Sequence, residues 1–486
     1  MSHSRPAQIL TAAALLLMPT LARAATPKPD FADLPAYLTA LNASSDPAAK
    51  AIRAEIADGP AALARERAAC AKLGLPTTLT QINQPLPPVS ENAAPLYGQW
   101  DALRKTTPLQ LPRFMTAAGT VSLRYAYTPA QLAEARAALA ARPEYTSLLD
   151  QATNRPRCVF ALDWTTYPKV DVFTHFASLR EASRTYSSEG FLQAKEGRFA
   201  DAVTTQARGF VVTEHVTDSS PILIGFLVAV ATDSTAVSGM QDILQIAGPN
   251  AAVDAQAQAA LAASGLSLSR AIGGECAAAD GLFLLVRHAP PADFAQLLPG
   301  DSPYRGKGRT AQKQFTPAQQ TQVMALIDAA EALTLSQTRA LYEAANLPRP
   351  AREEAFARSF GQAVSLRDDP VRILAAPISM AGQYTALTFP DFADRSAARH
   401  AVVAAGAAVL AASVKAGAFP DTLPAGLTDP YTGKPLGYRR EGTDGFVVYS
   451  VGGSGTFSGG SPGDKLTASQ VSFRYPAPPP APLPTE

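Results

Sequence analysis

Apolar residues recur at helical spacing on both sides of Gly197. The stripe before the glycine consists of Phe176, Leu179, Ala182 and Tyr186, and the stripe after it of Phe199, Ala202, Ala207 and Val211. Glycine is the residue that most easily ends a helix in a tight turn. The pattern therefore predicts an antiparallel helical hairpin over residues 171–216 that turns at Gly197 and brings Tyr186 near Arg208.

Two more helices are predicted to begin at Thr128 and at Thr316. Each threonine is followed directly by proline and, three positions later, by glutamine. A threonine cap, proline in the first turn and glutamine at the third helical position form a capping box. Apolar residues follow each start at helical spacing, which favours long helices over loops.

Near the C-terminus the pattern changes from helical to alternating. Residues 402–414 follow helical spacing, whereas residues 436–440 and 446–451 are rich in strand formers and are separated by a glycine-containing turn. Residues 471–475 alternate apolar and polar side chains. We expect these three segments to form a small antiparallel sheet that packs against the preceding helix, because a two-stranded hairpin alone is marginally stable.

Together these patterns predict a mainly α protein. It would have an irregular multi-helix body with helical hairpins and a small C-terminal α+β module of one helix and an antiparallel hairpin. We divide the chain into residues 1–24, a signal peptide; 25–105, a helical and proline-rich segment; 106–390, the helical body; 391–475, the α+β module; and 476–486, a proline-rich tail. The tail lacks apolar periodicity, which predicts disorder.

The first 24 residues have the features of a cleavable signal peptide. Arg5 precedes an apolar run over residues 9–18, and Ala22 and Ala24 surround the expected cleavage site. Two later apolar runs, at 221–231 and 401–414, are shorter than a membrane-spanning helix requires. We therefore expect a periplasmic or secreted protein without a transmembrane anchor after cleavage.

Composition agrees with a helical, nearly neutral protein. Of the 486 residues, 47% are apolar but only 7% are aromatic, and 42 basic residues face 41 acidic ones. Without Arg5 and Arg23 the mature charge is 40 − 41 = −1. Such a balance does not favour nucleic acid as a partner.

The three cysteines are too few and too widely spaced to form a disulfide framework. None of the three, Cys70, Cys158 and Cys276, belongs to a CxxC pair or to a zinc-binding pattern with histidine. The number is odd, so at most one disulfide can form within the chain and one thiol is left over. Buried thiols with one optional disulfide are the preferred interpretation.

Two segments of the C-terminal module resemble type II secretion pseudopilins. Residues 429–436 read DPYTGKPL, and residues 446–452 read FVVYSVG. The resemblance implies a helix before a small sheet and a calcium-binding loop. Ser454 stands where the pseudopilin loop has an acidic ligand, and Asp464 is the first acid after it. We therefore expect a pilin-like shape without calcium dependence.

The mature chain is also similar to a group of exported bacterial proteins that end in such a pilin-like module. The similar features are residues 87–97 (PPVSENAAPLY), residues 158–164 (CVFALDW) and the hairpin at Gly197. This resemblance implies architecture and export, but no catalytic residue and no cofactor.

Candidate chemistry is sparse. The sequence has no P-loop, GxGxxG or HExxH motif. An antiparallel hairpin would bring His215 near His175, with Asp163 and Glu214 as neighbouring acids. Such a cluster could bind a metal ion or serve acid–base catalysis. The preferred interpretation is that both histidines pack or cap at the open end of the hairpin, since metal sites need at least three convergent ligands.

Two functions remain open at this stage. The preferred one is a non-catalytic exported helical protein that uses its pilin-like module in envelope interaction or assembly, with an envelope protein or a peptide as partner. The alternative is a hydrolase or metal-dependent enzyme with a site between helices near His175 and His215.

Overall fold

The computed structural model describes residues 26–483 except 32, 109, 119, 168–170, 172, 289–314, 365–368 and 457–470. The expected signal peptide and Asp464 lie outside these residues. Most of the described chain is helical, as the sequence predicts. The N-terminal part contains α1 (Leu34–Ala43), α2 (Pro47–Lys72), α3 (Leu79–Ile82), α4 (Ala94–Thr106), α5 (Arg113–Ala118), α6 (Pro129–Ala140), α7 (Pro143–Thr153) and the 3-10 helix η1 (Trp164–Thr166).

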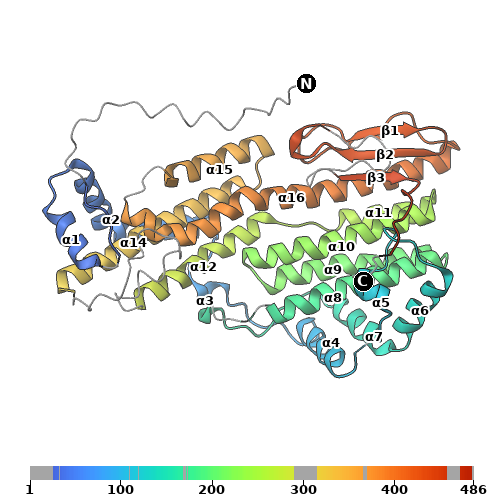
Figure 1. Cartoon of the computed structure of the whole chain (residues 1–486), viewed down its shortest axis with the longest axis horizontal. Coiled ribbons are helices and arrows are strands. Elements are labelled where there is room, and N and C mark those ends of the chain that lie inside the picture. The colour runs from blue at the N-terminus through green and yellow to red at the C-terminus, as the bar shows by residue number, and fades with distance from the viewer. Residues whose placement is uncertain are drawn as a thin grey trace.

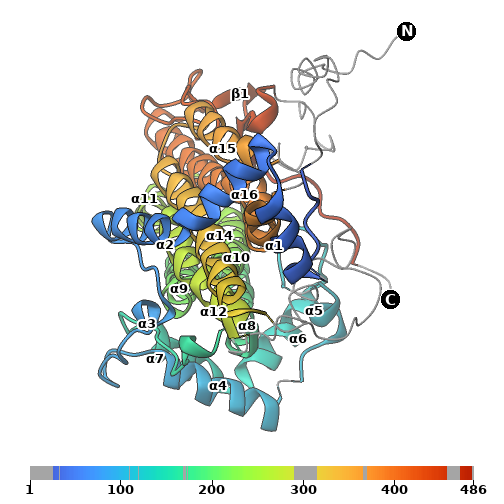
Figure 2. The same cartoon turned by 90° about the vertical axis from the view of Figure 1, so that its left-hand side faces the viewer.

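Long helices form the rest of the body and run roughly along the long axis of the molecule (Figure 1). They are α8 (Phe173–Lys195), α9 (Phe199–Ser219), α10 (Leu223–Ala247), α11 (Ala251–Ala262), α12 (Leu268–His288), α14 (Pro317–Ala344), α15 (Arg349–Val364) and α16 (Pro370–Ala416). Helices α8, α9 and α10 pack side by side, and α12 connects this group to α14 and α2. Figure 2 views the bundle from the end that carries α1 and α2.

The hairpin predicted around Gly197 is confirmed. Helix α8 ends at Lys195, α9 begins at Phe199, and Gly197 has a positive φ of 79°. Tyr186 and Arg208 meet through Asp150 of α7, which accepts a hydrogen bond from the Tyr186 hydroxyl at 3.1 Å and pairs with the Arg208 guanidinium.

Both predicted capping boxes are also present. The hydroxyl of Thr128 accepts a hydrogen bond from the backbone N–H of Gln131, and the Gln131 side chain accepts one from the N–H of Thr128. Thr316 and Gln319 repeat this arrangement at the start of α14.

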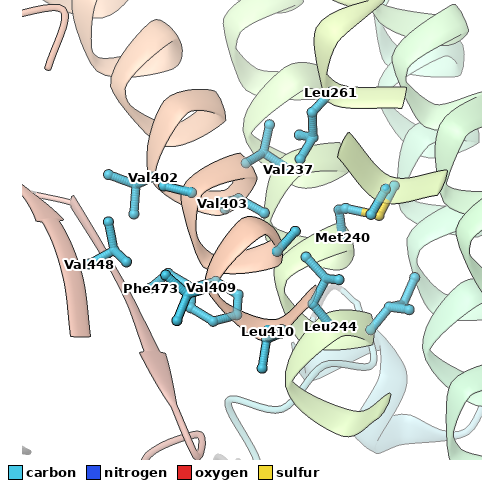
Figure 3. Packing of buried hydrophobic residues seen from close by; sticks show 14 of the residues in the cluster. Val237, Met240, Leu244, Leu261, Val402, Val403, Val409, Leu410, Val448 and Phe473 are labelled. Carbon is cyan, nitrogen blue, oxygen red and sulfur yellow. The ribbon is translucent and has the colours of Figure 1, made fainter. Parts of the chain in front are cut away.

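The C-terminal strands form a three-stranded antiparallel sheet in the order β1 (Gly437–Glu441), β2 (Gly445–Ser450) and β3 (Val471–Tyr475). This confirms the predicted helix-and-sheet module. Figure 3 shows the last part of α16 lying between the sheet and α10, with Val402 and Val409 near Val448 and Phe473. A Cβ on Gly406 would lie 2.5 Å from the Phe473 ring, so the glycine permits this close packing.

The turn that resembles pseudopilins is held by the buried carboxylate of Asp429. It accepts hydrogen bonds from the N–H of Tyr431, the hydroxyl of Ser450 and the N–H of Val451, each at 2.9 Å. These bonds join the DPYTGKP turn to the end of β2. The expected independence from calcium remains a prediction, because Asp464 lies outside the described residues.

Two features of the fold lie at segment limits read from the sequence. Helix α16 runs without a break across the limit expected at residues 390 and 391. The tail is placed as far as residue 483, where Ala481 exchanges backbone hydrogen bonds with Arg124 and Ala126 at 2.9 and 2.8 Å. The segment has no apolar periodicity, and backbone hydrogen bonds hold it instead.

Within the described residues, two helices are long and apolar enough to cross a membrane by length and composition. They are Leu223–Ala247, which is α10, and Phe389–Ala416 of α16. Half of each apolar stretch is buried inside the protein. The C-terminal parts of both helices share one core cluster with the sheet, whereas Phe226 and Phe389 belong to a second cluster.

Candidate functional site

A cavity of about 370 Å³ opens where the end of α9, the start of α10 and the start of α12 meet. The segment before Cys158 completes its wall with Pro156 and Arg157. A cavity of this size is within the range of small-molecule and side-chain binding sites. Its polar lining comes mainly from Arg157, Glu214, His215, Asp218, Ser220 and Arg270.

Asp218 is the centre of the charged part of this wall. Its carboxylate accepts hydrogen bonds from Arg157 Nε at 3.0 Å and from Arg270 Nη2 at 3.3 Å. The backbone N–H of Cys158 donates to the same carboxylate at 2.7 Å. Asp218 is mostly buried, whereas the arginine side chains are about half exposed, at 45% and 50%. One carboxylate thus holds two guanidinium groups. Arg157 contacts it through both Nε and Nη2, and its Nη2 also donates to Gln84 Oε1 at 3.0 Å. Arg270 contacts Asp218 through Nη2 and presents the larger open edge to a ligand.

Ser220 adds a buried hydroxyl to the same wall. Its residue is 4% exposed, and its Oγ has no hydrogen-bond partner within the described part of the chain. Leaving a buried hydroxyl without a partner costs free energy. Helices α10 and α12 both begin beside Ser220, at Leu223 and Leu268, and helix N-termini favour negatively charged groups. The orphan hydroxyl therefore indicates a place for a hydrogen-bonding anion.

Two neighbouring residues of α12, Gly274 and Glu275, contact the segment that forms the rim of the cavity. A Cβ on Gly274 would lie 2.1 Å from the Pro221 carbonyl oxygen, so the chain before α10 touches the α12 backbone. Glu275 accepts a hydrogen bond from the Leu223 N–H at 2.7 Å and caps α10. Burial raises the pKa of Glu275 to about 7.

His215 belongs to the same region, but both of its ring nitrogens are already hydrogen-bonded. Nε2 lies 2.9 Å from the Arg155 carbonyl oxygen, which can only accept, so Nε2 carries the proton. Nδ1 then accepts from the Tyr97 hydroxyl at 2.9 Å. Burial lowers the pKa of His215 and favours this neutral form. The ring positions Tyr97 and the 155–157 segment and has no free nitrogen for a ligand.

Glu214 is the second sequence-predicted residue in the wall. Its side chain is exposed in the cavity, and desolvation by the surrounding protein raises its pKa above the ordinary value. Arg157 and Arg270 carry two positive charges against one on Asp218. When Glu214 is protonated, this wall therefore has one net positive charge.

The other two predicted residues have different surroundings. The ring of His175 stacks on Phe160 with the centroids 4.1 Å apart, and burial lowers its pKa. Asp163 caps η1 by accepting bonds from the N–H and hydroxyl of Thr165, which lower its pKa. In the ranges that the structure describes, no three His, Cys, Asp or Glu side chains are grouped to hold a metal ion. Of the four predicted residues, His215 and Glu214 thus line one cavity, and the hairpin brings no metal-binding group together.

A serine, a histidine and an aspartate also meet where α16 passes α10 and the end of α11. His400 Nε2 lies 2.8 Å from Asp233 Oδ1, and its Nδ1 lies 3.3 Å from the Leu261 carbonyl oxygen and 3.4 Å from Ser264 Oγ. Both nitrogens face acceptors, and these contacts favour the protonated ring. Its pKa is raised by Asp233 against the opposing effect of burial. A protonated ring cannot activate Ser264, and we interpret the group as a structural ion pair.

The residues that sequence reasoning missed are Arg157, Asp218, Ser220 and Arg270. Asp218 and Ser220 are neighbours in the sequence, but Arg157 and Arg270 lie 61 and 52 positions from Asp218 and belong to no motif, so only the folded chain brings them together. The signals present were a polar cluster at the end of an apolar helix and Pro221 directly after it.

Comparisons with known proteins identified no relative, so any functional conclusion is based on this geometry. No protein-family model, no curated protein and no solved structure matches the chain.

Proposed function

We propose that the protein is an exported, non-catalytic protein of the cell envelope that binds a carboxylate group of a peptide partner in the cavity between α9, α10 and α12. The observation that carries the proposal is the shared Asp218 carboxylate, which presents Arg157 and Arg270 beside the orphan hydroxyl of Ser220.

The charge of the wall favours a carboxylate over a more highly charged anion. Two arginines against Asp218 and Glu214 leave one net positive charge when Glu214 is protonated and none when it is ionised, so the wall matches at most a monoanion. A guanidinium group can donate two parallel hydrogen bonds to a carboxylate, and the serine hydroxyl can donate a third. The C-terminal carboxylate of a peptide combines this charge with a chain that can continue into solvent.

A non-catalytic role is supported by the engagement of two of the three neighbouring acid–base groups, His215 and Asp218; the third, Glu214, is exposed in the cavity. Both nitrogens of His215 have partners, and Asp218 accepts four hydrogen bonds. Neither group has the free, oriented atom that a general base needs.

The binding test uses N-acetyl-trialanine and its C-terminal amide as probes in calorimetric titrations. We expect the acid to bind and the amide to bind at least about tenfold more weakly, which corresponds to about 1.4 kcal/mol. Arg270→Gln should weaken binding of the acid by a similar factor while the amide is unaffected. Arg65→Gln, an exposed arginine paired with Asp58 on α2, is the control. Equal binding of acid and amide, or no binding of either at millimolar concentration, contradicts the proposal.

Export is supported by the sequence of residues 1–24, and the pilin-like module by the covering of the three strands by α16. Expression of the whole chain in a bacterial host, followed by cell fractionation and N-terminal sequencing, tests export. A periplasmic or secreted chain that begins at Ala25 is expected. A cytoplasmic chain that retains residues 1–24 contradicts export without affecting the binding test.

A further inference from the structure

Cys70 and Cys276 meet in the interior although 205 residues separate them in the sequence. Cys70 lies in the last turns of α2, and Cys276 lies in the middle of α12. Both residues are fully buried, at 0% exposed. They share one apolar cluster with Leu63, Leu75, Ala332 and Leu335.

The two thiols are direct neighbours within this cluster. Interaction between the two buried thiols lowers the pKa of Cys70 and raises that of Cys276. Cys158 is apart from them, in the cluster that contains Tyr97 and Val216. The packing thus selects one pair from the three cysteines and leaves Cys158 as the odd thiol.

We propose that Cys70 and Cys276 form a disulfide that joins α2 to α12, and that Cys158 remains a free thiol. The oxidant is a disulfide compound, either a protein disulfide or glutathione disulfide. The Cys70 thiolate attacks one sulfur of the oxidant and releases the other as a thiolate. The Cys276 thiolate then displaces the second half, so two thiols lose two protons and two electrons, and the oxidant is reduced to two thiols.

This exchange takes place while the chain folds, because the finished cluster excludes a disulfide reagent from both sulfur atoms. Once formed, the bond is protected from reduction by the same burial. It closes a loop of about 200 residues, the kind of cross-link that removes most freedom from the unfolded chain. An oxidising compartment outside the cytoplasm provides the required oxidant.

The test refolds the reduced, denatured full chain with a mixture of reduced and oxidised glutathione, and in parallel with dithiothreitol alone. Free thiols are then counted in denaturant with a maleimide and mass spectrometry. From glutathione, the wild-type chain should retain one of its three thiols and lose the mass of two hydrogens. From dithiothreitol, it should retain all three.

The variants identify the pair. Cys158→Ser should retain no free thiol after refolding with glutathione, whereas Cys70→Ser and Cys276→Ala should each retain two. Peptide mapping of the wild-type chain should find Cys70 and Cys276 in one linked peptide pair. Three free thiols in the wild-type chain, or a linkage that includes Cys158, would overturn the proposal. Since glutathione is added to purified protein, the result does not depend on export or on ligand binding.

Discussion

Gly274 and Glu275 show how single residues of one helix shape the cavity without entering its charged wall. The missing side chain of Gly274 lets the Pro221 carbonyl approach the α12 backbone, and the Glu275 carboxyl holds the Leu223 N–H. Both contacts fix the loop that carries Ser220. The position of the orphan hydroxyl therefore depends on residues on the opposite side of the rim.

Replacing Gly274 by alanine tests this dependence. Alanine ordinarily stabilises a helix relative to glycine by about 1 kcal/mol, but the added Cβ would lie 2.1 Å from a backbone oxygen. We expect the clash to dominate, lowering the free energy of unfolding by about 1–3 kcal/mol and weakening binding of N-acetyl-trialanine at least about tenfold.

Gly265→Ala provides the matched control, because Gly265 lines the same cavity and a Cβ there would meet no atom within 4 Å. Calorimetric titration and denaturant unfolding of both variants make the comparison. Wild-type binding and stability in Gly274→Ala would show that the rim does not control the site.

The sequence pointed to two residues of the candidate site, His215 and Glu214. It did so for a chemistry different from the one that the structure supports. His215 and Glu214 were candidates for a metal or acid–base cluster, with packing or capping as the preferred interpretation of the histidines, and in the structure His215 is hydrogen-bonded to Tyr97. The sequence alone could not identify Arg157 and Arg270 as site residues, because nothing local distinguishes them among the 42 basic residues of the chain. Only the packing of the helices shows that they meet.

At the scale of elements, α16 connects the sheet to the helical body. One face of its last part covers the strands, and the other packs on α10 and α11. His400 and Asp233 add a buried ion pair between α16 and α10, at 2.8 Å. The groups around the ring are the Asp233 carboxylate, the Leu261 carbonyl, the Ser264 hydroxyl and the Phe210 ring.

The ion pair predicts a stability that depends on pH. The pKa of His400 is raised in the folded protein, so its stabilising contribution is complete below the ordinary histidine pKa of about 6.5. That contribution is lost as the pH rises through the folded pKa. His400→Gln should therefore lower the free energy of unfolding by about 3 kcal/mol at pH 6, and by clearly less at pH 9.

Denaturant unfolding at both pH values measures this difference. His288→Gln is the control, since His288 is exposed at the end of α12. A loss of stability in His400→Gln that is the same at pH 6 and pH 9 would contradict the charged state assigned to the ring.

Element prediction succeeded where local signals are complete. Capping residues define the starts of α6 and α14, and Gly197 with two apolar stripes defines the α8–α9 hairpin. Local signals carry no information on tertiary contacts: nothing local shows that Ala481 would pair with the backbone near Tyr125. The continuity of α16 across residue 390 has the same origin, since its two halves pack on different neighbours.

The whole molecule consists of a helical bundle with a small sheet at one end (Figure 1). A charged cavity lies between α9, α10 and α12. The bundle brings residues 157, 218 and 270 together from three parts of the chain. Binding at this cavity is therefore a property of the assembled fold, and no isolated segment should retain it.

The most direct test of the central claim is a crystal structure of the full chain with N-acetyl-trialanine. The account predicts that the probe's carboxylate lies in the cavity, within hydrogen-bonding distance of the guanidinium groups of Arg157 and Arg270 and of Ser220 Oγ. At equal probe concentration, the amide should occupy the cavity less than the acid does. A carboxylate bound elsewhere, or an amide bound in the same position as the acid, would contradict the claim.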